Sequence, residues 1–409
     1  MIKKINVNEL IPGMFISDFN CTWLQHPFLN NNVKVKDEKI INKICEYGIR
    51  EVYIDTDKGL DVAHAQTEKE MIQQIQTEIE EVIESATEDT VHKKQTSFKE
   101  ELVNAGKVIE EASQTVKNIM EDIKLGKQLN IETANEIVLK MIDSIIRNKD
   151  ALVSLGRIRK KDEYTFMHSV NVCVLMVAFS KHLGYDDKTI ELLGMGGLLH
   201  DIGKMRIPLS ILNKPYKLTA REYDIVKVHV KDGCDILAQS PGISETSFLV
   251  TSHHHERLDG TGYPRGLKGE EISDAGKMAA IADMYDAMTS DRCYKMKILP
   301  TSGLRELYEL RGIQLDDVMV QEFIRCFGIY PVGTLVRLKS GLLAIVIDNS
   351  DHNLLQPKVR VIYDANKEEF IRMPYEIDLS QSSGDGGADS ITNYESPERI
   401  HIHTLSYLP

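Results

Sequence analysis

The sequence predicts a mainly α-helical protein with a small α+β domain at its N-terminal end and a small antiparallel β appendage at its C-terminal end. Residues 124–328 place apolar side chains at helical spacing and show few strand-like alternations. A compositional break at Tyr330-Pro331 precedes four strand-like segments. We therefore expect five parts: an α+β domain at 1–62, acidic helices with a linker at 63–125, an all-helical domain at 126–328, a β appendage at 329–379 and a flexible tail at 380–409.

The first part alternates between strand and helix patterns. A strand-like segment over residues 2–7 leads to the turn signal Pro12-Gly13. Residues 37–47 have apolar residues at helical spacing, and residues 51–54 are strand-like again. This order predicts a small α+β unit.

The second part is strongly acidic. Residues 67–123 contain 14 Asp+Glu against 6 Lys+Arg, which is −8 of the total charge. Apolar residues recur at helical spacing on both sides of a polar linker over residues 85–97. Two interpretations stay open: an amphipathic helix pair that covers a neighbouring domain, or a coiled coil that joins two copies into a homodimer.

The C-terminal part predicts strands at residues 334–338, 342–348, 359–363 and 369–373, with turn residues between them. The segment SQSSGDGGADS, residues 380–390, is rich in Gly and Ser and is expected to be flexible.

Composition and charge exclude several classes of protein. The chain has 409 residues and a formal net charge of −13, which argues against a binder of duplex nucleic acid, because such binding depends on cationic contacts to phosphates. The longest apolar run, residues 172–179, is far shorter than the ~20 residues that span a bilayer. No signal-peptide pattern opens the sequence, and its six cysteines lack a CxxC spacing. We expect a soluble cytoplasmic protein with reduced thiols and no membrane insertion.

Histidines concentrate in the helical part, where seven of the 13 lie between residues 168 and 255. His200 and Asp201 directly follow an apolar helical run, so both side chains can reach one metal ion, and the second oxygen of Asp201 can reach another. Five imidazoles and two carboxylates can hold two divalent ions ~3.5–4 Å apart. This donor mixture suits Fe, Mn, Ni or Zn better than Mg or Ca. The candidate ligands are His168, His200, Asp201, His229, His254, His255 and Asp283.

These residues stand in segments that resemble the HD-GYP phosphodiesterases, a branch of the HD metal-dependent phosphohydrolases. The similar segments are DEYTFMHSVNV, LLHDIGKMRIP, HHERLDGTGYP, GLKGEEI and IADMYDAMTSDRCYK. Residues 1–60 also resemble the uncharacterised domain that often precedes HD-GYP domains, through NELIPGM, Trp23, His26-Pro27-Phe28 and YGIREVYIDT. The resemblance implies an all-helical HD-type catalytic domain with a binuclear metal site.

The implied activity is hydrolysis of cyclic di-GMP to the linear dinucleotide pGpG, and in many family members on to GMP. Carried over to this chain, one ion takes His168, His200, Asp201 and Asp283, and the other takes Asp201, His229, His254 and His255. A water held between the ions attacks phosphorus. This agrees with the donor count, since a two-metal site supplies both a deprotonated water and cations for the phosphate oxygens.

The resemblance also implies substrate contacts. Lys204 would contact the scissile phosphate beside Asp201, while Arg292 and Lys295 would bind the phosphates of the ligand. The loop that contains Gly262, Tyr263 and Pro264 would stabilise the site and form a docking surface for diguanylate cyclases with a GGDEF domain.

Three positions depart from the family pattern. Tyr164 stands where some members have a Glu that binds a third metal, so we expect two ions and, if the third ion is needed for the second hydrolytic step, pGpG as the product. Leu258 replaces a common Trp, and Tyr216 replaces a common Gly. Neither position is a candidate ligand.

Two other functions compete with hydrolysis of cyclic di-GMP. The ligand set recognises phosphate and not base, so another cyclic dinucleotide such as 3′,3′-cyclic GMP-AMP is an alternative substrate. A non-catalytic scaffold that binds cyclic di-GMP or a GGDEF protein is the alternative outside enzymes, and the intact ligand set argues against it.

Overall fold

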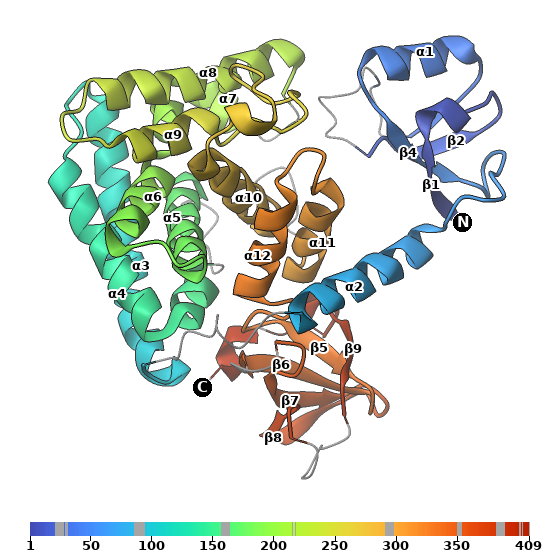
Figure 1. Ribbon diagram of the computed structural model, residues 1–409. Coiled ribbons are helices and arrows are strands. Elements are labelled where there is room, and N and C mark those ends of the chain that lie inside the picture. Colours follow the sequence, from blue (N-terminus) through green and yellow to red (C-terminus); the bar gives the residue numbers. More distant parts are fainter. Residues whose placement is uncertain are drawn as a thin grey trace. The chain divides into compact units, whose positions relative to one another are not determined.

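The computed structural model describes residues 1–20, 28, 32–85, 95–156, 164–214, 216, 218–290, 298–349, 354–381, 389–400, 402 and 404–408. The chain divides into two compact units, Met1–Glu78 with Thr219–Arg221, and Ile79–Leu218 with Glu222–Pro409. Helix α2 (Glu68–Glu84) runs from the first unit into the second (Figure 1). Among the described helices, none is long and apolar enough to cross a bilayer.

The N-terminal unit is α+β, as predicted. Its four strands form an antiparallel sheet in the order β1-β4-β2-β3, and buried residues of this sheet, including Ile16, Val52 and Ile54, pack with Ile44 of the helix. The Asp37 side chain accepts a hydrogen bond from the Ile40 amide and so caps that helix. The elements are β1 (Ile2–Asn6), β2 (Phe15–Asp18), β3 (Val33–Lys34), α1 (Glu38–Glu46) and β4 (Glu51–Asp55).

The second unit is mainly helical, and the predicted fold class is confirmed. Its helices are α3 (Phe98–Lys124), α4 (Ile131–Gly156), α5 (Tyr164–His182), α6 (Asp187–Leu199), α7 (Leu209–Leu212), α8 (Ala220–Ala238), α9 (Glu245–His253), α10 (Asp274–Thr289), α11 (Pro300–Leu310) and α12 (Asp317–Phe327). Short 3₁₀ helices, η4 (Ile202–Arg206) and η5 (Gly269–Glu271), separate some of them.

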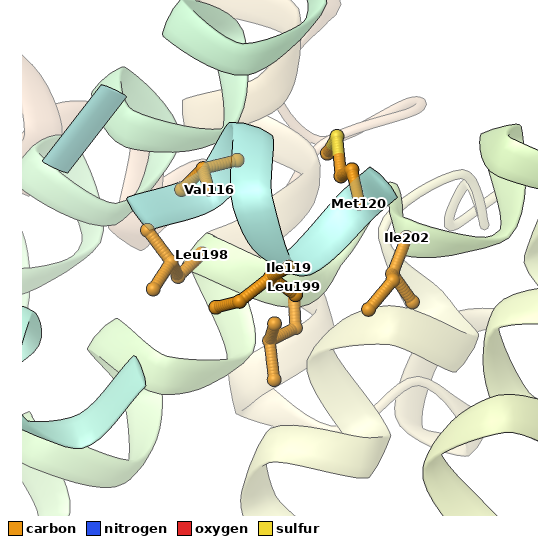
Figure 2. Close-up of a pocket in the computed structure, with 6 residues that line it drawn as sticks. All are labelled: Val116, Ile119, Met120, Leu198, Leu199 and Ile202. Atoms are coloured by element: carbon orange, nitrogen blue, oxygen red, sulfur yellow. The ribbon is translucent and has the colours of Figure 1, made fainter. Parts of the chain in front are cut away.

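The acidic helix α3 belongs to this helical unit. It packs most extensively on α4, and its buried residues include Ala105 and Ala112. Figure 2 shows Val116, Ile119 and Met120 of α3 beside Leu198, Leu199 and Ile202, which flank the His200-Asp201 pair. The helical unit therefore begins well before residue 126, where the sequence placed its start. For α3, the apolar stripe covers a neighbour within the chain, as the first interpretation of the acidic helices expects.

Helix α4 is broken at Asn148, whose backbone is not helical (φ −162°, ψ 103°). The Asn148 side chain replaces the lost helical bonds, because Oδ1 accepts from the Asp150 amide and Nδ2 donates to the Thr96 carbonyl. The second half of α4 ends at Gly156, close to the site described below.

The C-terminal strands form an antiparallel sheet in the order β8-β7-β6-β5-β9. All four predicted strands are present, as β5 (Leu335–Leu338), β6 (Leu342–Asp348), β7 (Lys358–Asp364) and β8 (Glu369–Asp378). The flexible tail predicted over residues 380–409 is wrong for its later part. Strand β9 (Ile391–Tyr394) pairs with β5, and Ile400, Ile402 and Leu408 pack on the sheet core, so hydrogen bonds and apolar burial hold this segment. Residues 382–388 lie outside the described part.

Candidate metal centre

The seven candidate ligands come from five places along the chain and meet in the helical unit. His168 lies on α5, His229 on α8 and Asp283 on α10, while the other ligands follow helix ends. His200 caps the C-terminal end of α6, and His254 caps the C-terminal end of α9. Asp186 and Ser244 cap the beginnings of those two helices through hydrogen bonds to backbone amides. All of the candidate ligands are buried except the half-buried His255.

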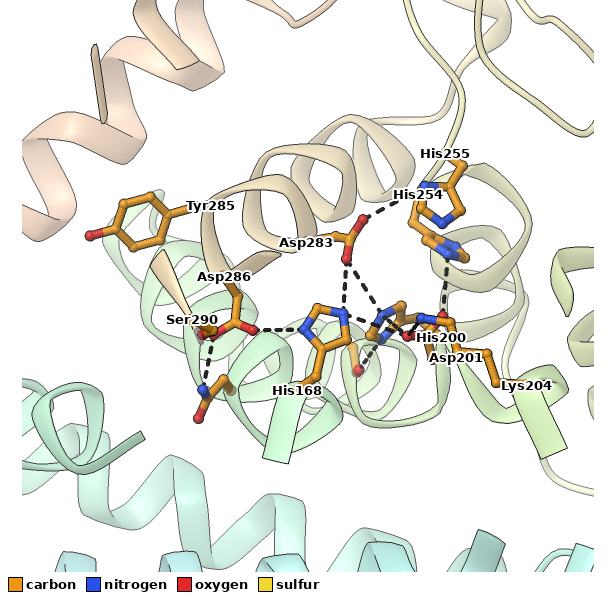
Figure 3. A network of polar contacts seen from close by, with 12 residues as sticks. His168, His200, Asp201, Lys204, His254, His255, Asp283, Tyr285, Asp286 and Ser290 are labelled. Atoms are coloured by element: carbon orange, nitrogen blue, oxygen red, sulfur yellow. Dashed lines mark hydrogen bonds and ion pairs between the residues drawn. The ribbon is translucent and has the colours of Figure 1, made fainter. Parts of the chain in front are cut away.

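The Asp201 carboxylate lies between two groups of histidines, of which Figure 3 labels His168, His200 and His254. Its Oδ2 is 3.5 Å from His168 Nε2 and 3.3 Å from His200 Nε2. Its Oδ1 is 3.2 Å from His229 Nε2 and 3.9 Å from His254 Nε2. Each carboxylate oxygen therefore faces a different pair of imidazoles, as a carboxylate that bridges two ions requires.

Asp283 also faces both groups. Its Oδ1 is 3.0 Å from His168 Nε2 and 3.9 Å from His200 Nε2, whereas its Oδ2 is 3.7 Å from His255 Nδ1. The sequence assigned Asp283 to one ion only. In the structure its second oxygen points toward the group that contains His255, so Asp283 can contact both ion positions.

Three of the histidine rings are oriented by hydrogen bonds at Nδ1, the nitrogen that faces away from the centre. The Nδ1 atoms of His200, His229 and His254 lie 2.7–2.8 Å from the carbonyl oxygens three residues earlier, those of Gly197, Val226 and Thr251. A carbonyl only accepts hydrogen bonds, so each Nδ1 carries the proton and each neutral ring turns an Nε2 lone pair toward the centre.

This donor set fits divalent metal ions. Nε2 of His229 and Nε2 of His254 lie 3.3 Å apart, so the two lone pairs repel unless a cation lies beside them. In the described part of the chain, His200 Nε2 and Asp201 Oδ1 are buried without a hydrogen-bond partner. Three groups of donor atoms, each within 4.8 Å of one another, could each hold an ion: His168-His200-Asp283, His200-Asp201-His254 and His229-His254-His255.

The electrostatics favour the metal-binding forms of both carboxylates and of two histidines, whereas the pKa of His200 is raised, because its burial is outweighed by Asp201 and Asp283. Burial opposes ionisation of both carboxylates, but Lys204 and His200 hold the pKa of Asp201 well below its usual range, and His168 and His255 do the same for Asp283. Burial and neighbouring histidines lower the pKa of His254 and His255 well below the usual value. At neutral pH the carboxylates are therefore charged, and these two imidazoles are neutral.

The predicted substrate contacts are only partly described. Lys204 lies inside the 3₁₀ helix η4, which follows α6, and its Nζ makes an ion pair with Asp201 Oδ2. Arg292 and Lys295 lie outside the described residues. Tyr164 begins α5, but its side chain is also outside the described part, so the expectation of a binuclear site is not tested at that position.

The loop with Gly262, Tyr263 and Pro264 is held by contacts with His255 and Glu256. The ring of Tyr263 stacks on His255 with centroids 4.5 Å apart, and the Tyr263 amide donates to the His255 carbonyl. Glu256, which is 1% exposed, accepts hydrogen bonds from the amides of Arg265 and Leu267 at 2.8 and 2.9 Å. The loop therefore lies directly against one of the candidate ligands.

Two other histidines lie outside the ligand set. His253 is buried beside Arg265 and Ser273, which matches a supporting role. The His182 side chain is 8% exposed and pairs with Glu322 at 3.0 Å. Sequence reasoning left the role of Asp286 open and missed Asn171. Their signals are the spacings Asp283-x-x-Asp286 and His168-x-x-Asn171, which place each residue one helical turn after a ligand.

The sequence matches three known domain families. Residues 2–134 match a domain of unknown function, DUF3391, residues 141–317 match the HD domain, and residues 335–384 match a KOW domain associated with the HD domain.

Similar proteins are known from several bacteria. The chain is 35% identical over 407 residues to the cyclic di-GMP phosphodiesterase PA4108 of Pseudomonas aeruginosa, covering 99% of this chain and 95% of the relative. It is 34% identical over 203 residues to the cyclic di-GMP phosphodiesterase response regulator RpfG of Xanthomonas campestris, covering 49% and 53% of the two chains. It is 39% identical over 168 residues to the 3′3′-cGAMP-specific phosphodiesterase 1 of Vibrio cholerae, covering 41% and 37%.

The HD domain match implies that divalent metal is bound, and the histidine and carboxylate cluster is suited to bind it. The resemblance drawn from the sequence motifs is confirmed by the similarity to PA4108 over almost the whole chain. The chain belongs to the HD-GYP family of HD-domain proteins.

Proposed function

We propose that this protein is a metal-dependent phosphodiesterase that hydrolyses cyclic di-GMP to pGpG. The observation that carries the proposal is the convergence of five imidazoles and two carboxylates, Asp201 and Asp283, in a chain whose near full-length relative is named a cyclic di-GMP phosphodiesterase. The intact set of candidate ligands supports an enzyme over a scaffold, since loss of any one would impair a two-metal site.

The proposed ligand sets are those implied by the family. His168, His200, Asp201 and Asp283 hold one divalent ion, and Asp201, His229, His254 and His255 hold the other. Fe or Mn is the proposed metal, with Ni and Zn as alternatives, because imidazole and carboxylate donors suit these ions. When bound, the two ions supply Lewis acidity to the phosphodiester and lower the pKa of water.

The surrounding residues orient and neutralise the substrate. Lys204 Nζ contacts Asp201 and is therefore within one side-chain rotation of a phosphate placed at the centre. An ammonium acts there as a mobile point charge, whereas the guanidinium of Arg292 offers a planar fork to a second phosphate. Lys295 is proposed to assist Arg292, and the Tyr263 ring to form one wall of the site.

Further parts of the proposal concern partners and location. The loop of Gly262, Tyr263 and Pro264 is proposed as a docking surface for GGDEF-domain proteins, and the acidic helix α2 as a contact between two copies of the chain. A cytoplasmic location, where a cyclic dinucleotide messenger would be met, is proposed as well.

The decisive experiment is a product assay. Protein purified without oxygen and loaded with Mn²⁺ or Fe²⁺ is incubated with cyclic di-GMP, and nucleotides are separated by chromatography. We expect pGpG to appear, and Asp201→Asn to remove detectable turnover. Asp224→Asn, an exposed Asp of α8 that pairs with Lys227, is the matched control and should retain full activity. No product with either metal would contradict the proposal.

The same assay separates the alternatives. The match to a relative named 3′3′-cGAMP-specific supports testing 3′,3′-cyclic GMP-AMP beside cyclic di-GMP. A higher kcat/KM for the mixed dinucleotide would replace the proposed substrate. Binding of cyclic di-GMP without turnover, unchanged by Asp201→Asn, would favour the scaffold.

A further inference from the structure

His168 is held differently from three of the other candidate histidine ligands. His200, His229 and His254 each give Nδ1–H to a carbonyl in their own segment, so their ring orientation follows from the local backbone. His168 Nδ1 instead lies 2.7 Å from the Oδ2 of Asp286, a side chain of α10. The orientation of His168 therefore depends on how Asp286 is held (Figure 3).

Asp286 is anchored through its other oxygen. Oδ1 accepts hydrogen bonds from Asn171 Nδ2 at 2.9 Å and from Ser290 Oγ at 3.2 Å. His168, Asn171 and Asp286 are 1%, 4% and 4% exposed, so water does not replace these bonds readily. With Oδ1 fixed by two donors, Oδ2 faces the imidazole, and Nε2 of His168 faces the ion position.

The orientation of the Asn171 amide is fixed by its partners. Nδ2 donates to Asp286 Oδ1 and also to the Gly156 carbonyl at 2.6 Å, and both partners can only accept. The opposite orientation would bring the Asn171 oxygen against two acceptors. Gly156 leaves room for this amide, since a Cβ at that position would lie 2.4 Å from Asn171 Oδ1. A small cavity of about 20 Å³ lies beside Asn171 and Asp286.

We infer that Asn171 is a positioning residue for the metal centre, which acts through Asp286 to aim the Nε2 of His168 at one of the two ion positions. The inference rests on the proposed two-metal site. It assigns to Asn171 a hydrogen-bonding role that is specific to an amide. A carboxylate at this position has no N–H to donate, and its negative charge would repel the Gly156 carbonyl oxygen and the Asp286 carboxylate. The C-terminal end of α4 therefore helps to position His168, because its Gly156 carbonyl accepts a hydrogen bond from Asn171.

The test measures metal binding without any nucleotide. The full chain is stripped of metal and titrated with Mn²⁺ by calorimetry, and the wild type is expected to bind two ions. For Asn171→Ala we expect the affinity of one ion to fall by about 10–100-fold and that of the other to stay within about twofold. Ser169→Ala is the control, because Ser169 is buried on the same helix and, among the described residues, its hydroxyl has no hydrogen-bond partner.

A double-mutant cycle separates positioning from general damage. If Asn171 acts through Asp286, Asn171→Ala should cost little further affinity once Asp286→Ala is present. Additive losses, equal losses at both ions, or unchanged binding by Asn171→Ala would each overturn the inference. Asn171→Asp, which keeps the size of the side chain, gives the same readout if Asn171→Ala does not fold. Failure of cyclic di-GMP hydrolysis in a wild type that binds two Mn²⁺ ions would contradict the proposed function and leave this inference standing.

Discussion

At the scale of single residues, Gly203 sets the distance between the His200-Asp201 segment and α8. A Cβ at Gly203 would lie 2.0 Å from the His229 carbonyl oxygen and 2.4 Å from the Gly233 amide nitrogen. Both atoms belong to the backbone, so no side-chain rotation can relieve the contact. The glycine of the HDxGK motif is therefore needed to keep His229 close to Asp201.

We expect Gly203→Ala to displace α8 and to lower the free energy of unfolding by at least about 2 kcal/mol, because overpacked backbone contacts cannot relax locally. Mn²⁺ affinity and turnover should fall together, since His229 moves with the helix. Urea titration and calorimetry measure the two effects. Gly106→Ala in α3 is the control: its Cβ would meet only Leu155 Cδ1 at 3.9 Å, and helix propensity favours Ala. A stable, metal-binding Gly203→Ala protein would refute the close-contact argument.

The sequence could name the ligands but not the atoms that they use. Spacing and motif identify His168, His200 and Asp283, because His and Asp residues that recur together in such motifs commonly bind metal ions. The choice of Nδ1 or Nε2 depends on which carbonyl or carboxylate lies behind each ring, and tertiary packing decides that. Asn171 was missed for a similar reason, since its spacing from His168 is a weak signal until the fold brings Asp286 and Gly156 beside it.

At the scale of elements, an ion pair between the buried Glu101 and the half-buried Arg147 joins α3 to α4. Glu101, which is fully buried, accepts hydrogen bonds from Ser144 at 2.7 Å and from Arg147 Nε at 2.7 Å. Burial alone would raise the pKa of Glu101, but Arg147 and Ser144 outweigh it and lower the pKa below its usual value. The acidic helix is thus attached to the catalytic helices by charge as well as by apolar packing.

This pair predicts a pH-dependent contribution to stability. The unfolded state takes up a proton near pH 4.3, above the folded pKa, so the stabilisation is complete above that pH and is lost as pH falls through the folded pKa. Glu101→Gln should cost about 2–4 kcal/mol at pH 7, and the difference from wild type should shrink below about pH 4. Urea titrations from pH 7 down to about pH 3 measure this. Glu110→Gln, at an exposed position of the same helix, should change little, and a constant Glu101→Gln deficit would exclude the linkage.

Periodicity predicted most elements of the fold, and its failures have physical causes. The strands of the C-terminal sheet were found because short apolar-rich segments are separated by turn residues. Strand β9 was missed because it is only four residues long and follows a Gly- and Ser-rich segment. Its stability comes from pairing with β5, a contact distant in sequence. The break of α4 at Asn148 was also missed, because one of the two hydrogen bonds that compensate for it is accepted by Thr96, which is distant in the sequence.

At the scale of the whole molecule, the acidic segment and the catalytic helices cannot be separated at residue 126. Leu198, Leu199 and Ile202 are at most 2% exposed, and α3 covers them directly beside the metal centre. A domain boundary at residue 126, chosen from the charge composition, would separate α3 from residues of the same hydrophobic core. The charged residues of α3 lie mostly on its solvent-exposed face, whereas its apolar face packs on the helical unit.

We expect a fragment of residues 126–409 to aggregate and to lose metal binding, because exposing large apolar side chains costs about 1.5–3 kcal/mol each. A fragment of residues 95–409, which keeps α3, should stay monodisperse and active. Size-exclusion chromatography and the product assay distinguish the two. Full activity of the shorter fragment would show that α3 is dispensable.

The net charge of −13 also has to be read by region. Most of it lies in residues 67–123, and the proposed substrate is an anion. Attraction at the site is local, since two divalent ions and Lys204 would outweigh the charges of Asp201 and Asp283. The overall acidity thus argues against binding of duplex nucleic acid without opposing a dinucleotide.

The hydrogen bonds that Glu256 accepts from the loop after Pro264 limit how far this loop can move. The amides of Arg265 and Leu267 can exchange their hydrogens with solvent only when the loop leaves the buried carboxylate. Because these two bonds tie the loop to a buried carboxylate, we expect it to act as a wall of the site and not as a moving lid. Turnover should then be insensitive to solvent viscosity unless product departure is itself limited by diffusion.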